Sequence, residues 1–461
     1  MDTSLSNTRQ EALMHRTSTA HRAARLLAGA ALLAASLTPA WAVPSFARQT
    51  GSECAACHVG AFGPQLTPFG QQFKINGYTE TDGQDGKVPL SAMMIANLTR
   101  SARDLPEVPD HFKANNNSAI QETSAFLAGR LTDHIGAFVQ STYAGVDRAW
   151  ALDQLDLRYA RSLTLGDKET TVGLAINGNP TLTDPFNTLG QWRFPYTASD
   201  FGFGQGPTPL MENLAGAVLG ANLYALHDKH WYGELGLYKS LSTKAISAIN
   251  AEDVGRLSHP ALYWRLAYLD DRKRDNWHVG LSGLSAALAP DRAAPSSTDH
   301  FSDWGLDAGY QWLGNREHVV TLNASWMHEG QKLKATQAVG GASNASGSLK
   351  TWRLTGSYTW QQTWGATAGL FGSGGSADTG LWGGSSYSAR PDTNGYMLQL
   401  DWTPWGKESS WGSPWANLRV GLQYTGYSRF NGGSHYIDDV NGVDRRARDN
   451  NTTMLFFWWS L

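Results

Sequence analysis

From about residue 89 to its C-terminus, the chain consists of long segments in which apolar residues alternate with polar or small ones. In the segment 320–326, Val, Leu, Ala and Trp alternate with Thr, Asn and Ser, and the segment 352–360 follows the same pattern with a Trp at each end. An alternation of period two puts the two sets of side chains on opposite faces of a β-strand. The chain after residue 88 is therefore predicted to be all-β.

The length of these segments indicates which face meets water. Strands of soluble sandwiches usually run ~5–6 residues, whereas a tilted strand needs ~9–11 to cross a bilayer, and the segments here reach roughly ten to thirteen. Their polar faces favour Gly, Ser, Thr, Asn and Gln, as in a lumen, and their apolar faces end in Trp and Tyr, as in interfacial girdles. Charged residues make up only 17% and the mean hydropathy is −0.36, which argues against a bundle of transmembrane helices. A large soluble all-β protein is the alternative.

The connections between the segments alternate between short turns and long loops. This arrangement is typical of outer-membrane barrels, which have an even strand number, short periplasmic turns and long outer loops. Two exceptions are a short outer turn near 147–150 and a longer inner connection at 403–414. We predict a transmembrane antiparallel β-barrel over 89–461, in the cell outer membrane and in contact with the lipid bilayer. Its sixteen strands are expected to start near residues 89, 119, 135, 151, 169, 214, 231, 261, 276, 302, 318, 349, 364, 394, 415 and 450.

The N-terminal residues 1–42 have the features of a secretory signal peptide. Arg16, Arg22 and Arg25 precede an apolar stretch over 26–37, and small residues follow it. A membrane anchor is the alternative, but about twelve apolar residues are too few for a ~30 Å hydrocarbon core. Translation can start at Met1 or at Met14. The formal net charge of −3 and the lack of a basic stripe argue against a nucleic-acid partner.

The chain has two cysteines, Cys54 and Cys57, and His58 follows the second. Cys-x-x-Cys-His is the attachment motif of c-type haem: thiols at this spacing reach the two vinyl groups of one porphyrin, and the histidine becomes an axial ligand of the iron. The motif has three alternative explanations. A redox dithiol would favour a βα context, and a structural zinc site would need a fourth ligand. A chance occurrence of the motif is the third. We predict one covalent haem c bound by Cys54 and Cys57, with His58 as the metal ligand, and assign no further catalytic residue.

The segment 43–88, which carries this motif, is short for a free-standing domain. We therefore expect it to pack into or against the barrel, plugging or capping the lumen, with Phe62, Leu66, Phe69 and Phe73 as walls for the haem.

The sixth ligand of the iron stays open. Methionine raises the potential of a haem and histidine lowers it. Met93, Met94, His111 and Met397 are the candidates, and ordinary packing or exposure is the alternative for each.

The residues 44–58 and 66–78, together with a second block over 177–196, resemble the outer-membrane fused monohaem cytochrome c–porin family of iron-oxidising bacteria. The resemblance implies an oxidoreductase that takes single electrons from extracellular Fe(II). It further implies that the electrons pass through the haem to a periplasmic c-type cytochrome or cupredoxin.

Two other functions stay open. The chain is alternatively a diffusion porin with a haem-bearing plug, or an electron conduit with another extracellular donor or acceptor. The long loop 179–213 is too apolar to project into water, so we expect it to fold inward as a lid, with an intersubunit contact as the alternative. Outer-loop acids such as Asp104 and Asp444 suit hard divalent cations and can raise the local Fe²⁺ concentration, with an ordinary solvated loop surface as the alternative for each.

Overall fold

A computed structural model describes residues 45–461 except 85, 294–296, 408–409, 411 and 413–414. The predicted signal peptide, residues 1–42, lies outside the described residues. Within the described residues, no helix is long and apolar enough to span a bilayer.

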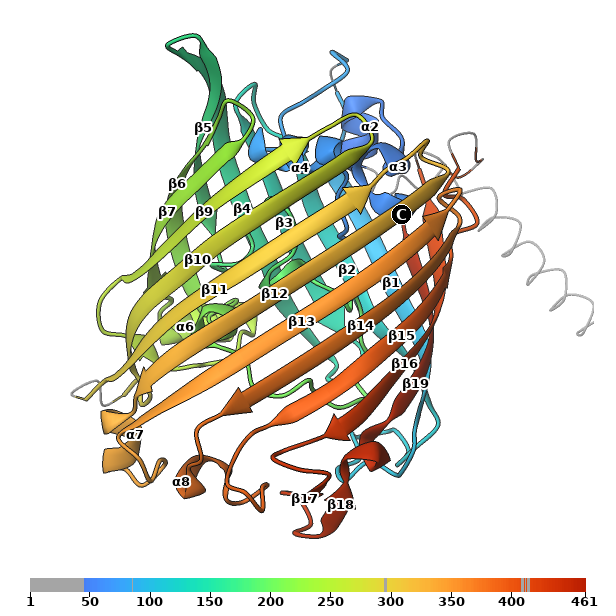
Figure 1. The fold of residues 1–461 in the computed structure, drawn as a ribbon. Helices are drawn as coiled ribbons and strands as arrows, with labels where there is room; N and C mark the ends of the chain where they lie inside the picture. Colours follow the sequence, from blue (N-terminus) through green and yellow to red (C-terminus); the bar gives the residue numbers. More distant parts are fainter. Residues whose placement is uncertain (1–44, 85, 294–296, 408–409, 411, 413–414) are drawn as a thin grey trace, which may run out of the picture. The chain divides into compact units, whose positions relative to one another are not determined.

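Sixteen long antiparallel strands of the described chain close into one barrel (Figure 1). Each strand pairs with its neighbours in sequence order, and β1 pairs with β19, where Ile95 lies opposite Trp458. The strands are β1 (Leu90–Ser101), β2 (Asn117–Arg130), β3 (Ile135–Ala144), β4 (Ala149–Leu165), β5 (Lys168–Asn177), β6 (Val218–His227), β7 (Trp231–Ser240), β9 (Ala261–Asp271), β10 (Asp275–Ala289), β11 (Asp299–Trp312), β12 (His318–Lys332), β13 (Ser346–Trp360), β14 (Trp364–Gly375), β15 (Thr393–Trp402), β16 (Asn417–Arg429) and β19 (Thr452–Ser460).

The predicted barrel is thus confirmed, and so are its two irregular connections. Only residues 145–148 join β3 to β4 at the long-loop end, and residues 403–416 make a longer connection at the short-turn end. The sixth strand starts at Val218 rather than near 214, because the helical turn α5 (Leu210–Asn213) directly precedes it.

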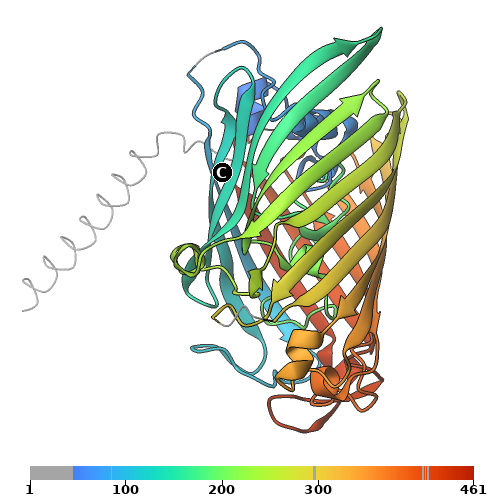
Figure 2. The same ribbon diagram turned by 90° about the vertical axis from the view of Figure 1, so that its left-hand side faces the viewer.

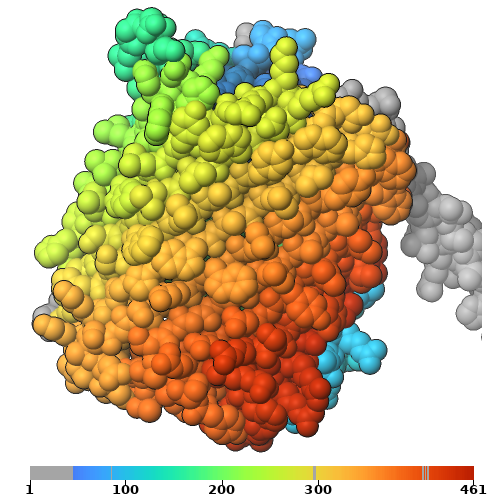
Figure 3. Space-filling view, in the orientation of Figure 1, coloured from blue at the N-terminus to red at the C-terminus, as the bar shows by residue number. Residues whose placement is uncertain are grey.

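The wall strands turn their apolar faces outward and their polar faces inward. In β7, Leu235 and Leu237 are 55% and 53% exposed, whereas Tyr232, Glu234 and Tyr238 are buried in the lumen. Figure 3 shows the outward face as a continuous surface crossed obliquely by the strands. A closed sheet leaves no unpaired edge, so a barrel with an apolar outer surface can reside in lipid. The protein is an outer-membrane β-barrel.

Exposed tryptophans mark one edge of this apolar surface. They lie on strand ends at the short-turn side of the barrel, where an interfacial girdle is expected. They are Trp231, Trp312, Trp360, Trp364 and Trp402.

The remaining elements are short. Near the start of β1 lie α2 (Ser45–Thr50), α3 (Cys54–Cys57), η1 (Val59–Ala61) and α4 (Pro68–Ile75). The loops contain η2 (Gly190–Trp192), α6 (Thr243–Ile249), β8 (Arg256–Leu257), α7 (Lys334–Ala338), α8 (Thr379–Trp382), β17 (His435–Ile437), β18 (Asp444–Arg446) and η3 (Ala447–Asn450).

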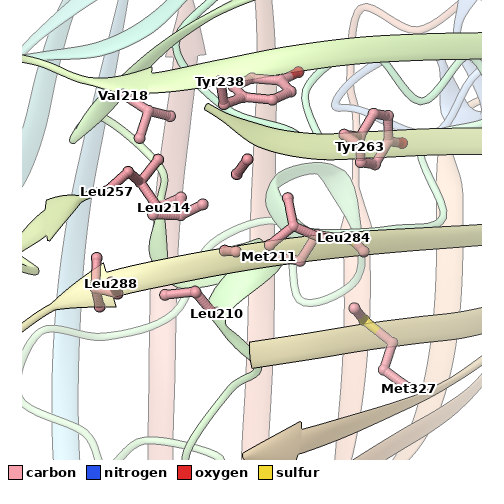
Figure 4. Close-up of a cluster of buried hydrophobic side chains, with 12 residues drawn as sticks. Leu210, Met211, Leu214, Val218, Tyr238, Leu257, Tyr263, Leu284, Leu288 and Met327 are labelled. Atoms are coloured by element: carbon pink, nitrogen blue, oxygen red, sulfur yellow. The ribbon is translucent and has the colours of Figure 1, made fainter. Parts of the chain in front are cut away.

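The connection 178–217, here called the lumen loop, folds inside the barrel, as expected for its apolar content (Figure 2). Its last part packs Leu210, Met211 and Leu214 against Tyr263 and Leu284 of the wall (Figure 4). The backbone N–H of Met211 also donates to the Asp303 carboxylate at 2.7 Å. The lumen therefore holds a packed loop fixed by both apolar and polar contacts.

Candidate functional site

The predicted site residues Cys54, Cys57 and His58 lie together at one cavity of about 360 Å³. The two cysteines begin and end the single turn of α3, and a spacing of three puts both thiols on one face of the turn. His58 leaves the helix in an extended conformation, with φ −121° and ψ 133°, and pairs with Leu66 in an isolated bridge. The structure thus brings the three residues to a single space.

The helix α4 holds this turn in place. The Thr67 N–H donates to the Cys57 carbonyl at 2.9 Å, and the Thr67 hydroxyl in turn accepts from the Gly70 N–H at the start of α4. At Gly70 a β-carbon would come within 2.3 Å of the Cys57 oxygen. Only glycine allows α4 to approach the cysteine turn this closely.

Nine Phe, Tyr and Trp side chains are among the described residues that line the cavity. Phe62 and Phe73 contribute from the N-terminal segment, and so does Leu66, as expected. Phe69 does not line the cavity and is 40% exposed, so its expected role is wrong. Sequence reasoning missed the other half of the lining, which comes from the barrel wall and the lumen loop: Phe126, Phe138, Trp192, Tyr196 and Trp458.

Burial sets the protonation state of His58. Desolvation and, to a smaller extent, the positive charge of Arg419 lower the pKa of its imidazole to about 4, although a hydrogen bond with the Gly63 backbone acts in the opposite direction. The ring is therefore neutral near pH 7, as a metal-binding imidazole must be. Its Nδ1 atom is buried and finds no hydrogen-bond partner among the described residues.

Burial raises the pKa of the two thiols, whereas it lowers the pKa of the imidazole. Desolvation raises the pKa of Cys54 to about 11 and that of Cys57 to about 12, and the two cysteines are not joined by a disulfide. Reactive dithiols and zinc ligands are thiolates, and no group of three His, Cys, Asp or Glu side chains in the described residues could hold a metal ion. A thioether carries no charge, so these surroundings suit attachment to a porphyrin better.

The residues present fit a c-type haem. Two thiols on one face of a turn, a buried imidazole nitrogen without a partner and an aromatic-lined cavity are the features that attachment and axial ligation need.

Of the four candidates for the sixth ligand, Met93 lines the cavity. Met94 is the next residue of β1 and points to the lipid side, because successive side chains of a strand alternate. His111 is exposed in the loop 102–116, at the opposite end of β1. Met397 is buried beside Phe194 and Phe371, outside this cavity.

The segment that carries the site is fixed to strands on different sides of the barrel. Arg158 of β4 donates to the Lys74 carbonyl at 3.0 Å, Gln311 of β11 to the Leu66 carbonyl at 2.7 Å, and Asn417 of β16 to the Ala61 carbonyl at 2.7 Å. Lys74 in turn donates to the Asp184 carbonyl of the lumen loop at 2.7 Å. The segment therefore lies within the lumen, toward the short-turn end.

No protein-family model matches the chain, and no curated protein matches it. Among solved structures it is similar to outer-membrane expressed OmpT of Vibrio cholerae, with a TM-score of 0.42, 9% identity, and coverage of 80% of this chain and 97% of that one. It is also similar to an anion-selective porin from Comamonas acidovorans (TM-score 0.43, 9% identity, 81% and 99% covered) and to OprB of Pseudomonas putida (0.46, 10%, 80% and 93%). These similarities concern the barrel fold and extend no further.

Proposed function

We propose that the protein is an outer-membrane electron-transfer protein with one c-type haem, attached to Cys54 and Cys57 and ligated by His58. The observation that carries this proposal is the convergence of two thiols and a buried imidazole, whose Nδ1 atom has no hydrogen-bond partner in the described residues, on one aromatic-lined cavity inside a membrane barrel. A bound haem would supply one-electron redox chemistry. The chain's own residues hold the group and exclude water from it.

The position of the site supports a periplasmic electron acceptor. The cavity includes Met93, near the start of β1, and Ser460, at the end of β19, and both lie toward the short-turn end of the barrel. In outer-membrane barrels the short turns face the periplasm. A periplasmic c-type cytochrome or cupredoxin is the partner that fits this side.

Extracellular Fe(II) is the proposed donor, on the resemblance to the iron-oxidising cytochrome–porins. The test is to add Fe(II) at neutral pH to the oxidised holoprotein in detergent and to follow the haem absorbance. We expect the spectrum of the reduced haem to appear. A protein that dithionite reduces and Fe(II) does not would contradict iron as donor, and would leave a conduit with another donor or acceptor.

A diffusion porin with a haem-bearing plug is the second candidate, favoured by the closed barrel itself. This function predicts a solute permeability that persists when Cys57 is replaced and the haem is lost. The lumen loop and the N-terminal segment both occupy the lumen, which supports the conduit instead. Conductance in planar bilayers separates the two.

Met93 is the proposed sixth ligand, because it lines the cavity from the wall. Met93→Leu is expected to lower the reduction potential by more than about 100 mV, since axial ligands span a range of ~0.8 V and methionine raises the potential. A spectroelectrochemical titration measures the shift. Met94→Leu, on the lipid side of the same strand, is the matched control and should leave the potential unchanged. An unchanged potential in Met93→Leu would exclude this ligand.

A further inference from the structure

Two carboxylates of the barrel wall border the same cavity as the Cys-x-x-Cys-His residues. Glu122 of β2 and Asp153 of β4 both line it, within electrostatic reach of each other. No basic side chain in the described part of the chain pairs with either carboxylate. Both side chains are partly buried, and negative charge withdrawn from water is costly unless protons or cations compensate it.

A β-bulge turns one of these carboxylates inward. Gln154 lies opposite Gln140, whereas the next pair is Leu152 with Ser141, so Asp153 is the extra residue. Neighbouring residues of a regular strand point to opposite faces. Because of the bulge, Asp153 and Gln154 both reach the cavity, and bulges of this kind commonly re-aim side chains beside functional sites.

A second β-bulge lies in β2, next to Glu122. Ile95 lies opposite Glu122 and Ala96 opposite Ile120, which leaves Gln121 as the extra residue. The Gln121 side chain is buried in the lumen, while its neighbour Glu122 still lines the cavity. Two strands of one wall therefore break their regular pairing where their carboxylates meet the cavity.

An unpartnered amide oxygen lies beside the carboxylates. Gln154 is 3% exposed, and its Oε1 atom has no hydrogen-bond partner in the described residues. It lines the same cavity as Glu122 and Asp153. A buried carbonyl oxygen of this kind lacks the donor or cation that such groups require.

The lumen loop contributes a third carboxylate, Asp200, on the side of the long loops. The Asp200 N–H donates to the Gln121 side-chain oxygen at 3.1 Å. Burial and then the charges of Glu122 and Asp147 raise the pKa of Asp200 to about 7. Asp147 lies in the short turn between β3 and β4, so acidic groups extend from the long-loop end of the barrel to the cavity. Such a field concentrates cations.

We propose that Glu122, Asp153 and the Gln154 amide oxygen form a binding site for a hydrated divalent cation of the Fe²⁺ and Mn²⁺ type at the cavity wall. Two carboxylates and one amide oxygen leave the remaining positions to water, as hard divalent cations allow. The role of the site, to hold a metal donor beside the cofactor, rests on the proposed function, whereas the binding itself does not.

The probe is Mn²⁺, whose free ion is followed by electron paramagnetic resonance as it is titrated with the purified holoprotein in detergent. We expect one bound Mn²⁺ per chain. The isosteric variant Glu122→Gln/Asp153→Asn should weaken this binding at least tenfold. Gln154→Leu, which keeps both carboxylates, should weaken it less. The matched control, Asp167→Asn/Asp291→Asn, removes two exposed carboxylates and should bind as the wild type does.

Mn²⁺ binding by Glu122→Gln/Asp153→Asn with wild-type affinity would overturn the site, and so would an equal loss in the control. A variant without the thiols, Cys54→Ser/Cys57→Ser, should retain Mn²⁺. Absence of haem from the wild type would refute the proposed function and leave the cation site standing, so the two failures are distinguishable. Heat-modifiable migration on a denaturing gel shows that each variant still forms the barrel.

Discussion

Replacing both thiols, as Cys54→Ser/Cys57→Ser, is expected to reduce the covalent haem content from one per chain to none. Thioether bonds need these two sulfur atoms, and the chain has no other cysteine. The barrel should still form, because its strands pair with one another and not with the cysteine turn. Haem absorbance after denaturation and extraction of unbound haem measures the loss, and heat-modifiable migration measures the barrel.

The matched control lies inside the motif. Ala55→Ser/Ala56→Ser changes the two intervening residues and keeps both thiols and His58, so full haem content is expected. Equal haem loss in this control would mean that the local fold, and not the sulfur atoms, decides attachment. Covalent haem in the double cysteine variant would refute the proposed site.

The strands could be predicted because their pattern is local. Alternation over a bilayer-spanning length fixes which face of a strand such as β12 is wet, whatever its neighbours are. The start of β6 could not be placed, because Leu214 belongs to the cluster that α5 packs against the wall. The inward fold of the lumen loop followed from its composition, but its anchoring residues come from distant strands.

The candidate site was predictable in its reactive residues and not in its surroundings. The spacing of Cys54, Cys57 and His58 indicates the proposed haem chemistry within five positions, and the structure places the three residues at one cavity. Ile95 and Trp458 border the cavity only because closure of the barrel brings β1 beside β19. The bulge at Asp153 depends on how two strands pair, which alternation along one strand does not reveal. Sequence reasoning therefore looked for acids in the outer loops and missed those facing the lumen.

Arg265→Leu is expected to destabilise the barrel by about 3–5 kcal/mol, the usual cost of removing one partner of a buried ion pair. The Arg265 guanidinium lies 3.0 Å from Asp184 of the lumen loop and 2.8 Å from Asp307 of β11, and all three side chains are fully buried. Without it, these two buried carboxylates lose the guanidinium that compensates their charge. The free energy of unfolding in denaturant, measured in detergent, tests this loss.

The same substitution should loosen the lumen loop. The Asp184 carboxylate accepts hydrogen bonds from the backbone N–H groups of Phe186, Thr188 and Leu189, so the turn that it organises is tied to the wall through Arg265. Loss of the Arg265–Asp184 ion pair leaves the lumen loop less firmly bound to the barrel wall. Ion conductance in planar bilayers should therefore rise above that of the wild type.

Two further variants separate charge from packing. Arg265→Leu/Asp184→Asn/Asp307→Asn removes the repulsion as well as the guanidinium and should recover part of the stability, since well-packed neutral groups often replace buried pairs at little cost. Arg272→Leu removes an exposed guanidinium that pairs with Asp270 near the end of the same strand, and it should change little. Wild-type stability and conductance in Arg265→Leu would show that the lumen loop is held by its apolar contacts alone.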